Sequence, residues 1–337
     1  MKFLIPFYLG IGNAVMFTPF LSTLRNKFPD ASIHLIGGLP WEPEKILPAE
    51  LFDEFHFLPK TAPFSGIMNM LSELPDLDVY FHPYQGSNYK FLMLLRILRP
   101  RVTVIGHAGL PGFRGICNRL LLSRGYSWKS GVHESRKYLN LLSGLQISDK
   151  EFISVPKIRS VPSILAPGYI VIHPGTTCNQ ESPKKYPLEH WLLVLKMLKE
   201  SGRQLVLVGD RTELELGNRL TAGCDFPVRN LIGQTTVSQL SGVLGSASLV
   251  LGADSGIAHM AGAQNVPLIV LWGPTDFSLS HPLGDKVHFL KKDFPCAPCT
   301  SAFRRSEKNA HRRCPESPCM NSISPQEIVD LALEILK

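Results

Sequence analysis

Short apolar runs alternate with helical patterns along this sequence, and the alternation occurs in two separate series. Runs rich in Val, Ile and Leu predict buried strands, and apolar residues that recur every three or four positions predict the helices that cover them. The first series has strands at 2–9, 32–37, 77–82 and 102–106, and helices at 14–28, 66–74 and 88–98. The second has strands at 169–173, 204–208, 248–252 and 267–272, and helices at 188–201, 212–221, 236–245 and 256–263. Each series is typical of a parallel sheet between layers of helices, so we expect an α/β fold of two such domains with a cleft between them.

The segment 153–168 separates the two series and contains three prolines. Proline fixes its own backbone and disfavours helix in the residue before it, so an extended linker is expected here. We therefore place the first domain at 1–160 and the second at 161–337. A chain of 337 residues with 44% hydrophobic residues is long enough to bury both cores.

The net charge of the chain restricts its partners. Lys and Arg number 35 against 28 Asp and Glu, which gives +7 at pH 7 and favours phosphorylated small molecules or an anionic membrane surface. The basic residues are spread along the chain and match no DNA- or RNA-binding motif, which argues against nucleic acid. The apolar run at 3–9 is short and lacks a cleavage site, and no segment is long enough to span a bilayer, so we expect a cytoplasmic protein with reduced cysteines.

The segment 249–261 predicts a buried strand, a polar turn and the first turns of a helix. Asp254 and Ser255 can accept hydrogen bonds from the N–H groups that open this helix, and Gly256 allows a phosphate to approach closely. His259 follows one helical turn after Ser255, on the same side. A helix N-terminus at the carboxyl end of a parallel strand is a usual binding place for nucleotide phosphates, whereas the alternative is an ordinary capped helix with a satisfied histidine.

Further polar residues precede helices of the second series. His173–Thr177 comes after one strand, and Lys184–Trp191 leads into a helix. The hydroxyl groups of Thr176 and Thr177 and the ammonium group of Lys184 suit a diphosphate. The alternative is a capped loop with solvent-exposed lysines.

Gly209, Asp210 and Glu213 follow the strand at 204–208. The Glu213 carboxylate could accept hydrogen bonds from ribose hydroxyl groups, or it could be a first-turn glutamate that the helix dipole stabilises. A tight turn at Leu271–Asp276 closes a later strand and is expected to shape the pocket.

The first series carries weaker phosphate-binding signals. Gly10–Asn13 turns the first strand into the first helix, but Val15 stands where a dinucleotide-binding fingerprint requires glycine. Ile36–Gly38, at the end of the second strand, offers no acidic residue to hold a ribose hydroxyl. These departures argue against a nicotinamide-dependent dehydrogenase, and the sequence also lacks a Walker A motif.

Taken in order, these motifs resemble glycosyltransferase family 9, the heptosyltransferases, over nearly the whole chain. The resemblance is carried by His173–Thr177, Lys184–Trp191, Val208–Asp210 with Glu213, Asp254–Gly256 with His259, and Leu271–Thr275. It implies a GT-B architecture, in which two Rossmann-like domains face each other across a cleft. It also implies an inverting transfer from a nucleotide sugar, typically ADP-heptose, that the C-terminal domain holds. The implied acceptor is a glycolipid or oligosaccharide, the Kdo or heptose part of a lipopolysaccharide core, docked on the N-terminal domain at the inner face of the membrane.

The resemblance assigns nucleotide-sugar binding to the positions that match the family motifs. Thr176, Thr177 and Lys184 correspond to residues that contact the diphosphate. The full donor set is Thr176, Thr177, Lys184, Gly209, Glu213, Asp254, Ser255, Gly256 and His259. Hydroxyl groups, a lysine and a helix N-terminus can stabilise a leaving diphosphate by themselves, so no cofactor or metal is expected for catalysis.

The sequence departs from the family at Gly12–Asn13. Family members commonly carry a Gly-Asp pair here, and the aspartate acts as the general base. A carboxamide cannot take a proton near neutral pH, so Asn13 is expected to orient the acceptor while His107, or a phosphate or carboxylate of the acceptor, takes the proton. The alternative is a non-catalytic nucleotide-sugar-binding protein that retains the fold.

Four cysteines, Cys296, Cys299, Cys314 and Cys319, gather in a proline-rich segment near the C-terminus. A Cys-x-x-Cys pair with two later cysteines is compatible with a structural zinc site, and the alternatives are free or disulfide-bonded thiols. Similar cysteine-bearing tails occur in many members of the family that the sequence resembles.

The segment 90–101 combines apolar bulk with basic residues at its C-terminal end. Such a helix can lie on an anionic lipid surface, which would make the protein peripheral at the inner membrane. The alternative is a helix that covers the sheet of the first domain, with its basic residues at the helix C-terminus.

Overall fold

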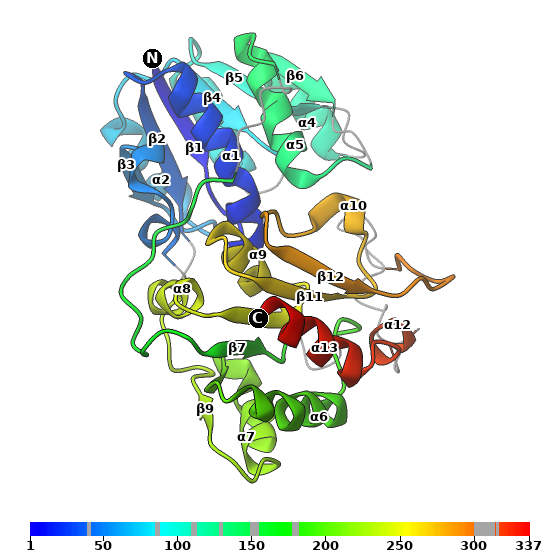
Figure 1. Ribbon diagram of the computed structural model, residues 1–337. Coiled ribbons are helices and arrows are strands. Elements are labelled where there is room, and N and C mark those ends of the chain that lie inside the picture. The colour runs from blue at the N-terminus through cyan, green and yellow to red at the C-terminus, as the bar shows by residue number, and fades with distance from the viewer. Residues whose placement is uncertain are drawn as a thin grey trace. The chain divides into compact units, whose positions relative to one another are not determined.

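The computed structural model describes residues 1–38, 42–84, 88–108, 113–127, 131–148, 155–176, 182–299, 314 and 317–337. The chain divides into two units, Met1–Pro156 and Lys157–Lys337 (Figure 1). Each unit contains one six-stranded sheet in which neighbouring strands pair in parallel. The expected α/β fold with two parallel sheets is therefore confirmed.

The sheet of the first unit has the strand order β3-β2-β1-β4-β5-β6. Its strands are β1 (Lys2–Pro6), β2 (Ser32–Gly37), β3 (Glu54–Phe57), β4 (Val79–His82), β5 (Thr103–Ala108) and β6 (Arg124–Ser127). Its helices are α1 (Ile11–Lys27), α2 (Phe64–Glu73), α3 (Tyr89–Leu98), α4 (Phe113–Leu121) and α5 (Glu134–Leu139), with short 3-10 helices η1 (Pro43–Lys45), η2 (Ala49–Leu51) and η3 (Asn140–Leu145). The helices α1 and α5 bury one face of this sheet, and α2 and α3 bury the other.

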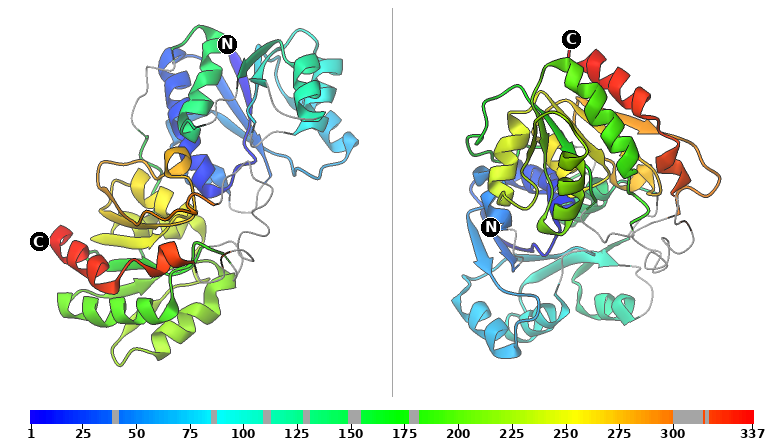
Figure 2. Two further views of the ribbon diagram at one scale, coloured as in Figure 1. Left: turned by 90° about the vertical axis from the view of Figure 1, so that its right-hand side faces the viewer. Right: turned by 90° about the horizontal axis from the view of Figure 1, so that it is seen from below.

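The sheet of the second unit has the strand order β12-β11-β10-β7-β8-β9. Its strands are β7 (Ile170–His173), β8 (Leu205–Leu207), β9 (Val228–Asn230), β10 (Leu249–Ala253), β11 (Leu268–Trp272) and β12 (Val287–Lys291). Its helices are α6 (Leu188–Leu198), η4 (Lys199–Ser201), η5 (Arg211–Glu213), α7 (Leu214–Ala222), α8 (Val237–Gly245), α9 (Gly256–Ala263), α10 (Phe277–Ser280), α12 (Pro318–Asn321) and α13 (Pro325–Ile335). The helix α13 runs beside α6, red beside green in Figure 2, and shares its core.

The predicted strands correspond to the inner strands of the two sheets, with small shifts at their ends. The first ends at Pro6 rather than at residue 9, and the helix after it begins at Ile11 rather than at residue 14. The four edge strands, β3, β6, β9 and β12, are absent from the sequence prediction, as is α13. Residues 155–168, the described part of the predicted linker, contain no helix or strand.

The inner side of helix α3 covers the first sheet, as one of the two alternatives for the segment 90–101 expects. Phe91, Leu92 and Leu95 are buried in the core between α3, α2 and the sheet. Its outer side leaves Met93 and Ile97 exposed. None of the helices in the described ranges combines the length and the apolar character that crossing a bilayer requires.

Candidate functional site

The carboxyl ends of the inner strands bring four sequence motifs of the second unit together. His173 ends β7, while Gly209, Asp254 and Thr275 follow β8, β10 and β11. These strands are parallel neighbours, so the four residues meet at one edge of the sheet. We call this place the polar edge and define it as His173–Thr176, Lys184, Gly209–Glu213, Asp254–His259 and Thr275.

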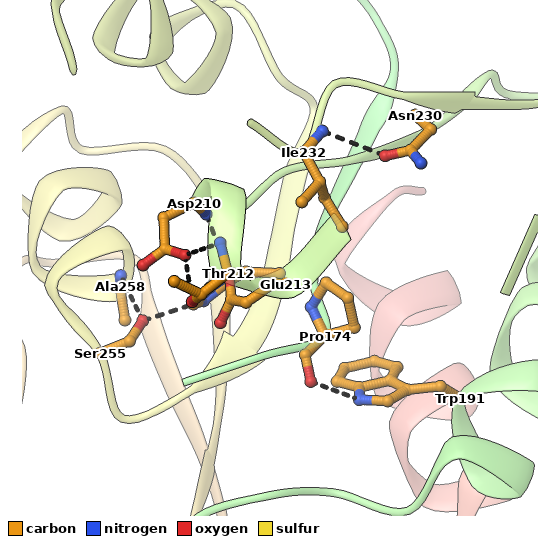
Figure 3. A network of polar contacts seen from close by, with 10 residues as sticks. Pro174, Trp191, Asp210, Thr212, Glu213, Asn230, Ile232, Ser255 and Ala258 are labelled. Atoms are coloured by element: carbon orange, nitrogen blue, oxygen red, sulfur yellow. Dashed lines mark hydrogen bonds and ion pairs between the residues drawn. The ribbon is translucent and has the colours of Figure 1, made fainter. Parts of the chain in front are cut away.

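Ser255 begins helix α9 as its N-cap. Its Oγ accepts a hydrogen bond from the N–H of Ala258 at 3.4 Å, as expected for this residue (Figure 3). Asp254 takes no part in the cap, so that half of the expectation is wrong. Its Oδ2 instead accepts hydrogen bonds from Lys184 Nζ at 2.7 Å and from Thr275 Oγ1 at 2.8 Å. The Asp254 carboxylate therefore serves an ion pair rather than the cap of α9.

The ion pair of Lys184 and Asp254 sets the charge of the polar edge. The Asp254 side chain is 7% exposed and that of Lys184 is 29% exposed. A buried carboxylate needs a cationic partner, whereas an ammonium group carries three donors and can hold a second anion on its solvent side. The pair therefore fixes a cation on the same edge as the N-terminus of α9, and both features attract anions.

His173 joins two parts of the polar edge, although the sequence assigned it no role. It is buried, with Nδ1 3.1 Å from Ser255 Oγ and Nε2 3.2 Å from Glu213 Oε2. A carboxylate oxygen accepts hydrogen bonds, so Nε2 donates to Glu213, and Nδ1 shares a hydrogen bond with the Ser255 hydroxyl group. The ring thus couples the cap of α9 to Glu213. A signal was present, because a histidine that ends a fully apolar strand needs polar partners.

Two glycines make room for the Glu213 side chain. A Cβ atom on Gly175 would lie 1.9 Å from Glu213 Oε1, and one on Gly209 would lie 2.3 Å from Oε2. Neither position therefore accepts a larger residue unless the carboxylate moves. Oε2 also accepts a hydrogen bond from the N–H of Asp210 at 3.0 Å, within a capping box that includes Thr212 (Figure 3). Glu213 is thus a helix-start residue and also a carboxylate held at the polar edge.

Two buried atoms of the polar edge, Thr176 Oγ1 and His259 Nδ1, have no hydrogen-bond partner in the described chain. Thr176 is 5% exposed and His259 is 4% exposed. Burial lowers the pKa of His259 to about 4, although Asp254 acts against this shift, so the ring is neutral at pH 7. Each unpaired buried atom costs roughly 1–3 kcal/mol, which a ligand or water that binds there would offset. Thr177, the other predicted threonine, lies outside the described residues.

The first unit presents a different kind of helix start at Gly10–Asn13. The 17-residue helix α1 has no side-chain cap and no acidic residue in its first turn. A Cβ atom on Gly10 would meet no atom within 4 Å, and both Gly12 and Asn13 are half-buried in this turn. Its first N–H groups face no competing carboxylate from its own first turn, which favours an anion there.

His107 does not fit its expected role as an alternative base. It is fully buried, its Nδ1 accepts a hydrogen bond from the N–H of Tyr84 at 2.9 Å, and its Nε2 lies 2.9 Å from the carbonyl oxygen of Lys137. Burial lowers the pKa of this ring to about 4. Since both nitrogen atoms are already used inside the first unit, His107 cannot take a proton from a substrate.

Cys299 and Cys319, two of the four C-terminal cysteines, lie against the turn that follows β11. The four thiols are free, and burial together with the neighbouring thiols raises the pKa of Cys299 and raises that of Cys319 to about 11. The N–H of Cys299 donates to the carbonyl oxygen of Pro274 at 3.0 Å, and Cys319 Sγ lies 3.1 Å from where a Cβ on Gly273 would be. These contacts therefore support the turn that carries Thr275, whose hydroxyl group donates a hydrogen bond to Asp254.

Known proteins similar to this chain agree with the resemblance of its motifs. A family model described as Glycosyltransferase family 9 (heptosyltransferase) matches residues 133–310, more than half of the chain. Lipooligosaccharide heptosyltransferase 2 of Campylobacter jejuni is 22% identical over 352 residues and aligns over 100% of this chain and 99% of its own length. Lipopolysaccharide heptosyltransferase 2 of Escherichia coli is 31% identical over 112 residues, which is 32% of this chain and 32% of the relative.

Solved structures share the fold. The structure of E. coli ADP-heptose lipopolysaccharide heptosyltransferase II has a TM-score of 0.78 at 19% identity and covers 100% of this chain and 98% of its own. A family 9 glycosyltransferase from Veillonella parvula has a TM-score of 0.80 at 17% identity and covers 99% and 97%. The fold is thus the GT-B fold that the motifs imply. With the match of the family model, the conclusion is that this chain belongs to glycosyltransferase family 9 and is a glycosyltransferase.

Proposed function

We propose that the polar edge of the second unit binds a nucleotide sugar, and that this donor is ADP-heptose. The observation that carries the proposal is the pair of buried, unpartnered atoms, Thr176 Oγ1 and His259 Nδ1, on the same edge as Lys184 and the N-terminus of α9. The choice of donor rests on relatives, because E. coli heptosyltransferase WaaC has been solved with ADP and with ADP-2-deoxy-2-fluoro heptose.

The diphosphate receives three kinds of donor in this arrangement. The Lys184 ammonium group keeps its bond to Asp254 and directs its remaining protons to the phosphates, while the hydroxyl groups of Thr176 and Thr177 donate to phosphate oxygens. The N–H groups at Ser255–Gly256, which the side chain of Ser255 does not bind, complete the cradle. These donors neutralise the leaving group, so transfer needs no metal ion.

Glu213 is the acceptor for ribose hydroxyl groups in this proposal. His173 and the Asp210 N–H hold Oε2, so the carboxylate keeps one orientation before the donor arrives. Gly209 contributes space rather than a contact, since a side chain there would displace the carboxylate. A carboxylate that is already oriented loses little entropy on binding.

The reaction is an inverting transfer. The acceptor hydroxyl oxygen forms a bond to the anomeric carbon of the heptose as the bond from that carbon to the diphosphate breaks. The charge that develops on the diphosphate is stabilised by Lys184 and α9, and the acceptor proton passes to a phosphate or carboxylate of the acceptor itself. Asn13 orients the acceptor hydroxyl through its side-chain amide, and the N-terminus of α1 attracts the anionic acceptor.

The acceptor we propose is a lipopolysaccharide core or a related glycan, since the relatives are lipopolysaccharide and lipooligosaccharide heptosyltransferases. Such an acceptor is lipid-linked, and the outer sides of α2, α3 and α4 suit a lipid surface. They expose large apolar residues, namely Phe64, Met68, Met93, Ile97, Leu98, Ile116 and Leu120. Lys90 in the first turn of α3 and Arg101 shortly after its end are exposed and favour anionic lipid, so in this proposal the enzyme acts in the cytoplasm, peripheral to the inner membrane.

We also propose that Cys296, Cys299, Cys314 and Cys319 bind a structural zinc ion. The structure describes all four residues, and no three of their sulfur atoms lie within 4.8 Å of one another, so binding requires these thiols to approach one another. Thiols that raise each other's pKa are stabilised as thiolates by a divalent cation, which would also hold the tail against Gly273 and Pro274. A relative with a TM-score of 0.58 and 13% identity, the E. coli glycosyltransferase TibC, is described as iron-containing. Elemental analysis for zinc and iron tests the site, and metal-free protein with titratable thiols and an unaltered fold would rule it out.

Two measurements test the donor site and the transfer separately. Calorimetry of the full chain with ADP, UDP and GDP in the presence of EDTA measures donor binding, and we expect ADP to bind without metal. Product formation from ADP-heptose with a panel of core acceptors measures transfer. Binding without transfer to any acceptor would favour the non-catalytic alternative, and the failure of all three nucleotides to bind would overturn the donor site.

A further inference from the structure

A cluster of metal-binding side chains lies in the first unit, where β2 and β3 pair at one side of the sheet. His34 of β2 and both Glu54 and His56 of β3 each offer one ligand atom, and the three atoms lie within 4.8 Å of one another. No other group of three His, Cys, Asp or Glu ligands in the described part of the chain meets this condition. The cluster has no role in the transfer reaction proposed above.

The three ligand atoms form a triangle of suitable size for a metal ion. His34 Nδ1 lies 2.9 Å from His56 Nε2 and 3.3 Å from Glu54 Oε2, and His56 Nε2 lies 3.7 Å from the same oxygen. Zinc bonds to nitrogen and oxygen are about 2.0–2.2 Å, so ligand atoms in a tetrahedral site are about 3.3 Å apart. The observed separations scatter around that value.

The sheet register explains why these side chains meet. In the parallel pair of β2 and β3, His34 lies opposite Glu54 and Ile36 lies opposite His56. Side chains two residues apart on a strand point to the same face, so Glu54 and His56 share a face, and His34 lies on that face of the neighbouring strand. The two rings stack with centroids 5.2 Å apart.

A hydroxyl group outside the triangle orients the first histidine. Ser32 Oγ lies 2.8 Å from His34 Nε2, which is the ring nitrogen that faces away from the cluster. A proton on Nε2 leaves the lone pair of Nδ1 for a metal ion, and such partners of ligating histidines are a regular part of metal sites. The serine thus provides the second nitrogen with its hydrogen bond.

The two histidines of the cluster are buried, and its carboxylate is exposed. The side chains of His34 and His56 are 6% and 14% exposed, whereas that of Glu54 is 59% exposed. Neutral imidazole is the ligand form, and the exposed carboxylate leaves a path for the ion and for water as a fourth ligand.

We propose that His34, Glu54 and His56 form a binding site for a divalent transition-metal ion, with zinc as the ion that two imidazoles and one carboxylate suit best. His34 lies in the middle of β2, where it pairs with Leu4 in the middle of β1, so the site is away from the carboxyl ends of the inner strands. Substrates of such sheets bind at those carboxyl ends. The ion therefore cross-links the edge strand β3 to β2 and stabilises the first unit.

The test uses the full chain after treatment with EDTA. Zinc chloride is titrated by calorimetry, and thermal unfolding is followed with and without the ion. Wild-type protein should bind zinc at this site and unfold at a higher temperature with it. Glu54→Gln, a change at an exposed side chain that leaves folding intact, should weaken this binding at least tenfold, and His56→Asn should abolish it. Glu50→Gln removes a carboxylate of the same unit outside the cluster and should bind as wild type does.

Cobalt distinguishes this site from the cysteine tail. Cobalt bound to imidazole and carboxylate gives weak visible bands, whereas thiolate ligands add strong near-ultraviolet absorption. We expect one cobalt ion without thiolate bands in wild-type protein, and its loss in His56→Asn. The proposal is overturned if zinc affinity and zinc-dependent unfolding are the same in wild type, Glu54→Gln and His56→Asn, or if every bound cobalt ion shows thiolate absorption.

Discussion

Both units begin a helix at the carboxyl end of a central strand, but the polar groups around the two helix N-termini differ. In the second unit Ser255 caps α9, and His173 and the Lys184–Asp254 pair surround the cap with fixed polar groups. In the first unit α1 starts after Gly10 with no side-chain cap and no acidic residue in its first turn. A fixed hydrogen-bond network suits a part of the ligand that never varies, such as a diphosphate. A helix N-terminus without a side-chain cap attracts anions of varied shape.

The test with the largest expected effect changes Asn13, which lies in the first turn of α1, the helix without a side-chain cap. Asn13→Asp introduces a group that can take the acceptor proton, and general-base catalysis is worth about 10²–10⁴-fold. We expect transfer from ADP-heptose to accelerate by a factor in this range while ADP affinity stays unchanged. A slower variant would mean that the new carboxylate repels the anionic acceptor more than it assists proton transfer. An unchanged rate would remove Asn13 from the reacting centre.

The second test adds one methyl group next to the Glu213 carboxylate of the polar edge. Gly175→Ala places a Cβ atom 1.9 Å from Glu213 Oε1, so the carboxylate must move and its bond to His173 is disturbed. A misplacement of about 1 Å costs roughly 10²-fold in rate, and we expect a loss of transfer of this size with weaker ADP binding. Gly10→Ala is the matched control, because its Cβ meets no atom within 4 Å and ADP affinity should be retained. Equal ADP affinity in both variants would contradict the role of Glu213.

A third test removes the cation of the polar edge. Lys184→Ala deletes a charged hydrogen bond to the diphosphate and should weaken ADP binding by about 1.5–3 kcal/mol, measured by calorimetry in EDTA. Lys196→Ala removes an exposed lysine of α6 in the same unit and is expected to leave the affinity as it is. Undiminished affinity in Lys184→Ala would take this residue out of the site.

A fourth test compares the stability of the two units in acid. Burial lowers the pKa of His82 to about 3 and of His107 to about 4 in the first unit, and of His259 to about 4 in the second. An unfolded chain protonates histidine near pH 6.5, so between pH 6.5 and 4 the unfolded state binds more protons. Stability is therefore complete above pH 6.5 and falls as the pH drops, by about 1.4 kcal/mol per pH unit for each histidine.

Hydrogen exchange followed by mass spectrometry at pH 7, 6 and 5 measures this difference in each unit separately. We expect peptides of the first unit to lose protection before those of the second, with corrections for the intrinsic pH dependence of exchange. The reverse order, or a simultaneous loss, would contradict the assignment of the larger acid sensitivity to the first unit.

The sequence predicts the inner strands of both sheets but none of the edge strands. An inner strand has two neighbours and covered faces, which requires a nearly continuous apolar run, as in β10 and β11. An edge strand has one neighbour and tolerates polar residues, and β6 (Arg-Gly-Tyr-Ser) and β9 (Val-Arg-Asn) leave no apolar signal. The fold class follows from the inner strands alone, which is why it could be predicted.

In the candidate site, too, the sequence predicts contacts between residues that are close in the chain and misses contacts between distant ones. The cap at Ser255 depends on residues within one helical turn and can be read from the chain. The partners of Asp254 cannot, because Lys184 is 70 residues away and reaches it through the order of the strands. His173 and Glu213 are likewise 40 residues apart, so the bond that orders the polar edge has no sequence signature.

Substitutions at positions 175, 209 and 213 are expected to affect one another, because all three share the space around the Glu213 carboxylate. A side chain at Gly175 or Gly209 would collide with the carboxylate at position 213, so each such change is harmful while Glu213 remains. A shorter residue at position 213 would remove the collision, and the combined effect would differ from the sum of the single effects. Libraries that aim to alter the nucleotide preference of this enzyme should therefore vary positions 175, 209 and 213 together, since one-position scans would reject combinations that only succeed as a set.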